Sequence, residues 1–332
     1  MKEKEEKINL YCKDYLEWMS AKGNLGMDIF PFYNLDSFYN VCFTLNEAFK
    51  NYKFKDDVNT KDFVKMDFFN KVGLVKDFFK SINMDIDVEK SLQDGTINPS
   101  FIEFNYENIK DYMKKGRTNI DANDNGDVTF PNSGMLLDSI VMVHELGHYA
   151  NRLNHTSQSA IMSEVVAIYT ELQFYDYLSN LGYDNEVRFL KNFRLKDTKK
   201  LSEKCLSSIS LLLTYMKYGT LNEENYYKMF PNNNYLDSLN KITDKNDFYS
   251  ISMNMNYTVG FLMATYLYWK TKEDFTFTEN INVFNKHLNE HSFYENLKML
   301  KVENFDKENM VNISKYVIEY LNKDNMIKAK VR

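Results

Sequence analysis

The chain has few of the residues that interrupt helices. Only 4 prolines and 11 glycines occur among its 332 residues. Both are rare inside helices, because proline removes a backbone donor and glycine loses more conformational entropy on folding. Residues that favour helices, such as Leu, Lys, Glu and Met, are frequent. The composition predicts a mainly α-helical protein with little sheet, large enough for one core or for two lobes that share a cleft.

Cysteine and long apolar runs are scarce as well. Cys12, Cys42 and Cys205 are widely spaced and form no CxxC pair, which is typical of free thiols in a reducing compartment. No segment approaches the roughly 20 apolar residues that span a bilayer, and the start has no signal-peptide run. The net charge of −6 disfavours a nucleic-acid partner. We expect a cytoplasmic protein without membrane or nucleic-acid partners. Leaderless export and the oligomeric state stay open.

Apolar periodicity and turn residues predict the order of the first elements. Helices are expected over 3–20, 35–52 and 61–81, and a short strand over 101–104. Segments 118–123 and 127–130 flank Asn125-Gly126, which is a strong hairpin signal. The same stretch partly imitates a calcium-binding loop, but its twelfth position is Asn132 instead of a bidentate glutamate. A hairpin is therefore the better interpretation.

A pattern with metal-binding spacing follows the hairpin. His144-Glu145-Leu146-Gly147-His148 has the form HExxH, and the apolar residues 140–143 predict that it lies on a buried helix beginning near Met135. Positions i and i+4 share one face of a helix, so both imidazoles can bind one metal ion. Glu145 would lie beside that ion and take a proton from water. The pattern predicts a zinc peptidase with one Zn²⁺ per chain.

A catalytic zinc usually has three protein ligands, so one ligand is missing from the motif. The metzincin pattern would need Gly and His where Asn151 and Asn154 stand, and His155 is out of register. A glutamate from the following helix is the other source. Glu164 and Glu171 compete for this role.

Helix geometry favours Glu164 over Glu171. The polar segment 154–159 predicts a helical hairpin, in which Glu164 faces His148. Glu171 would lie roughly 10 Å further along, at about 1.5 Å per residue. We therefore choose Glu164 as the ligand. Glu171 would either accept a hydrogen bond from a ligand histidine or face solvent.

A second histidine pair has the inverted spacing. His287-Leu288-Asn289-Glu290-His291 reads H-x-x-E-H, which is the order of inverted zincins. Its surroundings, 282–292, are polar, and no acidic residue follows on a strong helix. The context favours a solvated helix or loop over a metal site.

Several stretches resemble one known family, the oligopeptidase F and thimet oligopeptidase group of zinc metallopeptidases. The resemblance extends over roughly residues 113 to 325. It is carried by Gly134 and Asp138 before the motif, then by Ser163-Glu164-Val165-Val166-Ala167, Asp247-Phe248-Tyr249 and Tyr257-Thr258-Val259-Gly260-Phe261. These are similar to the family's Gly-x-x-x-Asp, Ala-Glu-Val-Ala-Ser, His-Phe-Tyr and Tyr-Ala-Thr-Gly-Phe segments.

The resemblance implies an architecture and a set of roles. We expect a helical lobe over 1–112 and a zincin-like catalytic domain over 113–332. A small sheet would lie beside the motif helix, and the site would lie in a cleft between two helical lobes. In this reading Glu164 binds zinc, and Tyr257 or Tyr249 donates to the oxyanion. The further candidates are Asp138, with Glu171, as support for the ligands, and Asn132 and Gly134 at the strand that holds a peptide.

The chain also departs from the family pattern. The family's histidine is Asp247 here, and two of its tyrosines are Met253 and Met255. The segment between His148 and Glu164 is shorter, and the N-terminal part is smaller than the helical lobe of the family. These departures leave weak, altered or lost activity open.

Three functions are consistent with these patterns. The first is a zinc endopeptidase for short peptides, with the hairpin strand either holding the substrate or simply packing on helices. The second is a zinc-binding scaffold that has lost its chemistry. The third is a zinc protease dedicated to one protein target.

Overall fold

The computed structural model describes residues 2–24, 35–54, 62–102, 116–120, 126–151 and 160–327. They form two compact units, each built from separate parts of the chain. Unit 1 comprises Met1–Tyr52, Asp197–Leu262 and Glu303–Arg332, and unit 2 comprises Lys53–Lys196 and Met263–Val302. The predicted boundary at residue 112 falls outside the described residues.

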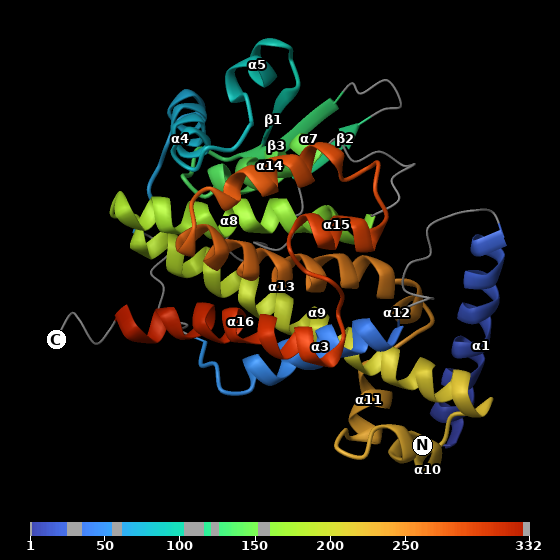
Figure 1. Ribbon diagram of the computed structural model, residues 1–332. Helices are drawn as coiled ribbons and strands as arrows, with labels where there is room; N and C mark the ends of the chain where they lie inside the picture. The colour runs from blue at the N-terminus through green and yellow to red at the C-terminus, as the bar shows by residue number, and fades with distance from the viewer. Residues whose placement is uncertain are drawn as a thin grey trace. The chain divides into compact units, whose positions relative to one another are not determined.

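The described part of unit 1 is helical. Its elements are α1 (Lys2–Asn24), α3 (Leu35–Phe49), the later part of α9 (Asp184–Tyr218), α10 (Glu223–Met229), α11 (Tyr235–Lys241), α12 (Asn246–Tyr249), the first part of α13 (Ile251–Glu273) and α16 (Lys307–Ile327). Helix α16 packs on α3 (Figure 1). Cys42 lies in the core with its Sγ 3.4 Å from Met255 Sδ. Cys12, Cys42 and Cys205 are all buried free thiols.

Unit 2 contains the sheet and the helix with the HExxH motif. Its helices are α4 (Phe68–Ser81), α5 (Val88–Gln93), α7 (Asp138–Asn151), α8 (Ser163–Asn180), α14 (Phe277–His287) and α15 (Phe293–Met299), with parts of α9 and α13. Among the described residues the strands are β1 (Ile97–Phe101), β2 (Arg117–Ile120) and β3 (Gly126–Asn132), in the order β1-β3-β2. Helix α7 packs on β3 and β2 and also contacts α8 and α14 (Figure 1).

The predicted mainly helical fold with a small sheet beside the motif helix is confirmed in unit 2. Strands β2 and β3 pair antiparallel, from Arg117 opposite Thr129 to Ile120 opposite Gly126. The expected turn residues 121–125 lie outside the described part of the chain. Strand β1 adds to the other side of β3 in parallel, a pairing that the hairpin signal could not reveal.

Several predicted boundaries are wrong, and two of them have a clear physical reason. Helix α4 begins at Phe68, not 61, because Asp67 caps it by accepting from the backbone N–H of Asn70. Helix α7 begins at Asp138, because Met135 is drawn into an antiparallel bridge with Lys65. The first strand covers Ile97–Phe101 instead of 101–104.

A buried ion pair holds the corner where β3 turns into α7. The Asp138 carboxylate accepts from the backbone N–H and hydroxyl of Ser133, at 2.9 Å and 2.7 Å, and from Lys71 Nζ. Lys71, on α4, also donates to Asn132 Oδ1 at 2.6 Å. Both charged side chains are fully buried. The corner is thus fixed by three elements that meet only in the folded chain.

Candidate metal centre

Helix α7 presents two histidine side chains toward one point. His144 and His148 are one turn apart, and their Nε2 atoms lie 3.0 Å from each other. The opposite side of the helix is buried in the core through Met142, Val143 and Leu146. Because the apolar face is anchored, the histidine pair cannot rotate away from the contact with α8.

Glu164 completes the cluster from the first turn of α8. Its Oε1 lies 3.5 Å from His148 Nε2, and its Oε2 lies 3.5 Å from His144 Nε2. The two helices can approach this closely at Gly147, where a Cβ atom would lie only 2.8 Å from the Cα of Ala167. A ligand atom of each of the three residues lies within 4.8 Å of the others.

These three residues fit a zinc ion. With zinc–nitrogen distances of about 2.0–2.1 Å and tetrahedral angles, ligand atoms are separated by roughly 3.3 Å. The 3.0 Å between the two Nε2 atoms and the 3.5 Å from each Nε2 to a Glu164 oxygen are close to this value. Glu164 Oε2 is also a buried oxygen without any hydrogen bond, which is costly unless a cation binds it. The donor set of two imidazoles and one carboxylate is one that catalytic zinc uses.

The charge balance of the centre also favours a cation. Glu145, Glu164 and Glu171 are all buried. Burial by itself would lower the pKa of His148, but the negative charge and hydrogen bond of Glu164, together with the other two glutamates, raise it to about 9. The site therefore stabilises positive charge at the position of its histidine nitrogens. Because a metal ion competes with protons for the same nitrogens, this preference is compatible with metal binding.

Glu171 contacts the ring nitrogen of His144 that faces away from the cluster. Its Oε1 lies 2.5 Å from His144 Nδ1. Arg194, on α9, donates to both oxygens of this carboxylate, and Tyr175 donates to Oε2 at 3.2 Å. Burial would raise the pKa of Glu171, but the Arg194 charge and the His144 hydrogen bond lower it to about 2. An ionised Glu171 accepts a hydrogen bond from the Nδ1–H group of His144, which leaves the Nε2 lone pair facing the cluster.

Arg194 and Tyr175 were not found from the sequence. Arg194 is 23 residues beyond Glu171, on another helix, and nothing in its local sequence distinguishes it from an exposed arginine. Tyr175 follows Glu171 by one helical turn and could have been identified by its i, i+4 spacing.

Glu145 is held from the edge of the sheet. The hydroxyl of Thr118, on β2, lies 2.8 Å from Glu145 Oε2 and 2.9 Å from its backbone oxygen. Gly116 precedes that strand, and a Cβ atom there would lie 2.6 Å from Glu145 Oε1. The same Cβ atom would lie 2.4 Å from Val141 Cγ1, so a larger residue at 116 would displace both the Glu145 and the Val141 side chains. Neither Thr118 nor Gly116 was predicted to take part.

The other candidates near the motif lie at the β3–α7 corner. The contacts of Asp138 are with Lys71, Ser133 and the backbone of Met135, at the start of α7. The buried amide of Asn132 faces Lys71, and the Gly134 carbonyl accepts from the backbone N–H of Met66 at 2.9 Å. The corner thus orients the beginning of the motif helix.

One of the two interpretations, in which the strand before Gly134 holds a peptide, requires a free edge, and most of that strand has none. Strand β3 is the middle of the sheet, paired with β1 over Val128–Asn132 and with β2 over Gly126–Thr129. In the part of the sheet that is described, the edge strand beside the motif helix is β2. The pairing of β1 depends on a segment about 30 residues upstream, so local sequence could not indicate it.

The two tyrosine candidates belong to unit 1. Tyr249 packs edge-on against Tyr15 and Trp18, with ring centroids 5.7 Å and 5.2 Å away. Tyr257 is half-buried on α13. Asp247, at the position where the family that the sequence resembles has a histidine, is buried and bound to Lys204 and to the Thr243 backbone and hydroxyl. The expected roles of the tyrosines at an oxyanion stay predictions.

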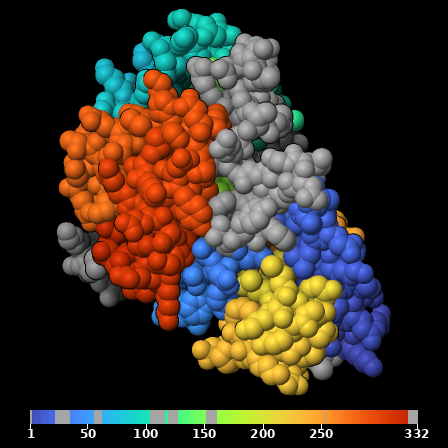
Figure 2. Space-filling view, turned by 45° about the vertical axis from the view of Figure 1, so that its right-hand side comes forward, coloured from blue at the N-terminus to red at the C-terminus, as the bar shows by residue number. Residues whose placement is uncertain are grey.

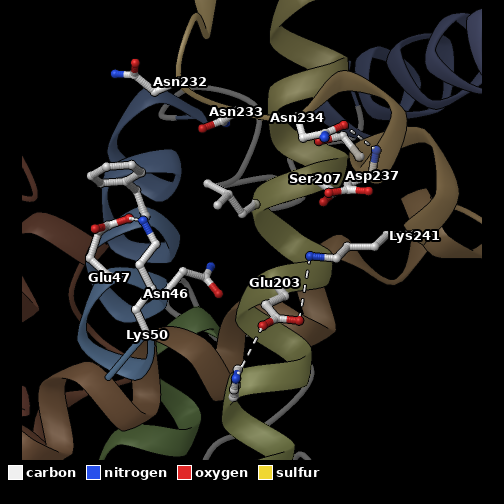
Figure 3. A pocket seen from close by; sticks show the side chains of 14 residues that line it. Asn46, Glu47, Lys50, Glu203, Ser207, Asn232, Asn233, Asn234, Asp237 and Lys241 are labelled. Carbon is white, nitrogen blue, oxygen red and sulfur yellow. Dashed lines mark hydrogen bonds and ion pairs between the residues drawn. The ribbon is translucent and has the colours of Figure 1, made fainter. Parts of the chain in front are cut away.

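Unit 1 also contains a polar pocket of about 590 Å³ between α3, α9 and the α10–α11 segment (Figure 3). Its lysines are already paired with acids: Lys50 with Glu47, and Lys241 and Lys199 with Glu203 at 3.6 Å and 4.0 Å. Positive charge is therefore compensated within the pocket. None of the predicted zinc ligands lines it.

No protein-family model and no curated protein matches the chain. Solved structures of peptidases do share its fold. PZ peptidase A with an inhibitor is 11% identical, with a TM-score of 0.53 over 91% of this chain and 60% of its own. A proposed oligoendopeptidase F is 10% identical, with a TM-score of 0.51 over 97% and 66%. A proposed peptidase from Chlamydophila abortus is 12% identical, with a TM-score of 0.51 over 95% and 55%.

The chain therefore has a peptidase fold and spans between 55% and 66% of the length of these structures. At such low identity the similarity concerns the fold and not the chemistry. Within the described residues, no helix combines the length and the hydropathy that crossing a membrane requires.

Proposed function

We propose that this protein is a zinc-dependent peptidase that hydrolyses peptide bonds in short peptides. The observation that carries the proposal is the cluster of His144, His148 and Glu164, with the buried carboxylate of Glu145 on the same helix. These three residues would hold one Zn²⁺. Bound zinc supplies Lewis-acid chemistry, polarising a carbonyl group and lowering the pKa of water.

Glu145 acts as the general base in this proposal. It takes a proton from the attacking water and later passes that proton to the leaving amine. The Thr118 hydroxyl holds one carboxylate oxygen, so that the other is left for the water. Gly116 leaves room beside that second oxygen.

The peptide backbone would bind along the edge of β2, in extended form. Unpaired N–H and C=O groups of an edge strand can add a peptide as a further strand. Asn132 and Gly134 contribute to peptide binding by shaping the β3–α7 corner. Asp138 holds that corner to α7. Tyr257, or alternatively Tyr249, donates to the oxyanion of the tetrahedral intermediate.

The experiment that tests this function compares the wild-type protein and Glu145→Gln on a mixed-sequence quenched peptide library. Because removing a general base typically costs about 10²–10⁴-fold in rate, we expect the variant to be almost silent. Its zinc content, measured by mass spectrometry, should equal that of the wild type. Equal cleavage by both proteins would refute the mechanism.

A second candidate is a zinc-binding scaffold without catalysis. It is favoured by Asp247, whose carboxylate is engaged by Lys204 and Thr243 where the similar family has a histidine. This candidate predicts bound zinc and no cleavage of any peptide in the library. Cleavage that depends on Glu145 would exclude it.

A further inference from the structure

A second group of metal-binding side chains lies at the end of helix α14. His287, Glu290 and His291 each present a ligand atom within 4.8 Å of the others. The geometry points to a second site for a divalent transition-metal cation, separate from the cluster of His144, His148 and Glu164. The sequence context alone favoured a solvated helix or loop at this position.

The turn that carries these side chains is built on buried anchors. Leu288, between the two histidines, is fully buried. The buried amide of Asn296 donates to the backbone oxygens of Leu288 and His291, at 3.1 Å and 3.0 Å. The backbone N–H of Glu290 donates to the carbonyl of His287 at 3.0 Å. The ligands therefore project from a fixed backbone, which reduces the entropy lost when they bind an ion.

The next residues hold the other end of this turn. Ser292 caps the start of α15 with a capping box, in which its own backbone N–H and hydroxyl contact Glu295 Oε2 at 2.8 Å and 2.7 Å. Glu295 is thereby occupied, and Glu290 is the acidic side chain that faces His287, with its Oε2 2.8 Å from Nδ1. Figure 2 shows the stretch from α14 to α15 at the surface of the molecule, in orange to orange-red.

The types of ligand atom and the partial charge of the nearby helix end determine which ion the site prefers. Two imidazoles and one carboxylate suit Zn²⁺, Ni²⁺ or Cu²⁺, whereas Ca²⁺ and Mg²⁺ prefer oxygen ligands alone. His287 lies in the last turn of the 11-residue helix α14, where the partial negative charge of the helix C-terminus attracts cations. The side chains of His287 and Glu290 are 36% and 65% exposed, so water completes the coordination and binding is weaker than at a buried site.

A bound ion would connect the end of α14 to the turn before α15. Helix α14 packs against α7 within unit 2, so the ion would brace a helix that contacts the HExxH helix. Glu290 pairs directly with His287, and we propose no catalytic role for it. The site is structural, and it does not depend on the proposed peptidase activity.

Equilibrium dialysis of the full chain against Zn²⁺, followed by mass spectrometry, tests the proposal. The wild type should bind two ions at saturation, of which the weaker one is lost in His291→Ala. The double variant His144→Ala/His148→Ala should retain only the weaker ion. Lys286→Ala, at an exposed residue beside His287 that belongs to neither group, is the control and should keep two.

Copper spectroscopy supplies a second measurement that does not rely on stoichiometry. Cu²⁺ added to His144→Ala/His148→Ala should show imidazole coupling in electron paramagnetic resonance, and this coupling should disappear when His287 and His291 are also replaced. A wild type whose single zinc ion is lost in His144→Ala/His148→Ala, or a second ion that survives His291→Ala, overturns the site. Either result leaves the Glu145 test untouched.

Discussion

At the scale of single residues, Arg194 is the main addition to the centre. It is the cation that keeps the buried Glu171 ionised, with hydrogen bonds to both carboxylate oxygens. Glu171 in turn fixes the ring of His144 through Nδ1. Arg194 is thus a positioning residue, which acts on a ligand through one intermediate carboxylate.

We predict that Arg194→Met weakens zinc binding by about 10–100-fold, as is typical when a partner of a ligand is removed. The zinc affinity of Arg194→Lys should lie between those of the wild type and Arg194→Met. Lysine keeps the positive charge but lacks the planar guanidinium group that donates to both carboxylate oxygens. Zinc affinity is measured by competition with a chelator. Arg188→Met, at an exposed arginine of the same helix, is the control. Unchanged affinity in a folded Arg194→Met protein would contradict the role.

Asp247 gives a prediction for acid stability. Burial would raise its pKa, but the hydrogen bonds from Lys204 and Thr243 lower it below the usual value. Its stabilising contribution is therefore complete above the unfolded-state pKa of about 3.9 and is lost as the pH falls through the folded-state value. Asp247→Asn should lower the free energy of unfolding by about 1–3 kcal/mol at pH 7. The difference from wild type in urea unfolding should shrink toward pH 3, and a constant difference would count against this account.

At the scale of elements, the contact between α7 and α8 decides the geometry of the centre. It brings the two histidines of one helix to the glutamate of the next, and Gly147 is the point of closest approach. A side chain at this position would meet the backbone of Ala167 instead of a flexible side chain, so it cannot be accommodated by a rotamer change.

Gly147→Ala should push the helices apart, destabilise the protein by about 1–3 kcal/mol and weaken zinc binding. Gly73→Ala on α4 is the matched control, because its Cβ would meet nothing within 4 Å. That control should stabilise the protein by about 0.5–1 kcal/mol through its better helix propensity. Both effects are read from denaturant unfolding. Equal stability of the two variants would argue against a tight contact.

At the scale of the whole molecule, the chain builds two units from alternating segments. Unit 2 takes its sheet and motif helix from the middle of the chain and adds 263–302 later, while unit 1 contains both termini. The proposed zinc ion would cross-link α7 and α8 inside unit 2. Metal binding and folding of that unit are therefore expected to be coupled.

Removal of zinc by a chelator should lower the melting temperature. An ion present at 1,000 times its dissociation constant stabilises the folded state by about 4 kcal/mol. Calorimetry with and without chelator measures the shift. In His148→Ala the chelator should have a much smaller effect, and an identical shift in both proteins would place the stabilising ion elsewhere.

The sequence by itself determined the local features of this protein. Scarce glycine and proline predicted a helical fold, and HExxH spacing predicted that two imidazoles share a helix face, because both depend on neighbours within one or two turns. The tertiary structure alone decided which distant residues contact the motif helix and its ligands. Four features join segments that are far apart in the chain. They are the central position of β3 in the sheet, the start of α7 fixed by Lys65 and Lys71, the contact of Thr118 with Glu145, and the contact of Arg194 with Glu171. Such pairings depend on packing and burial across the unit, which local periodicity does not record.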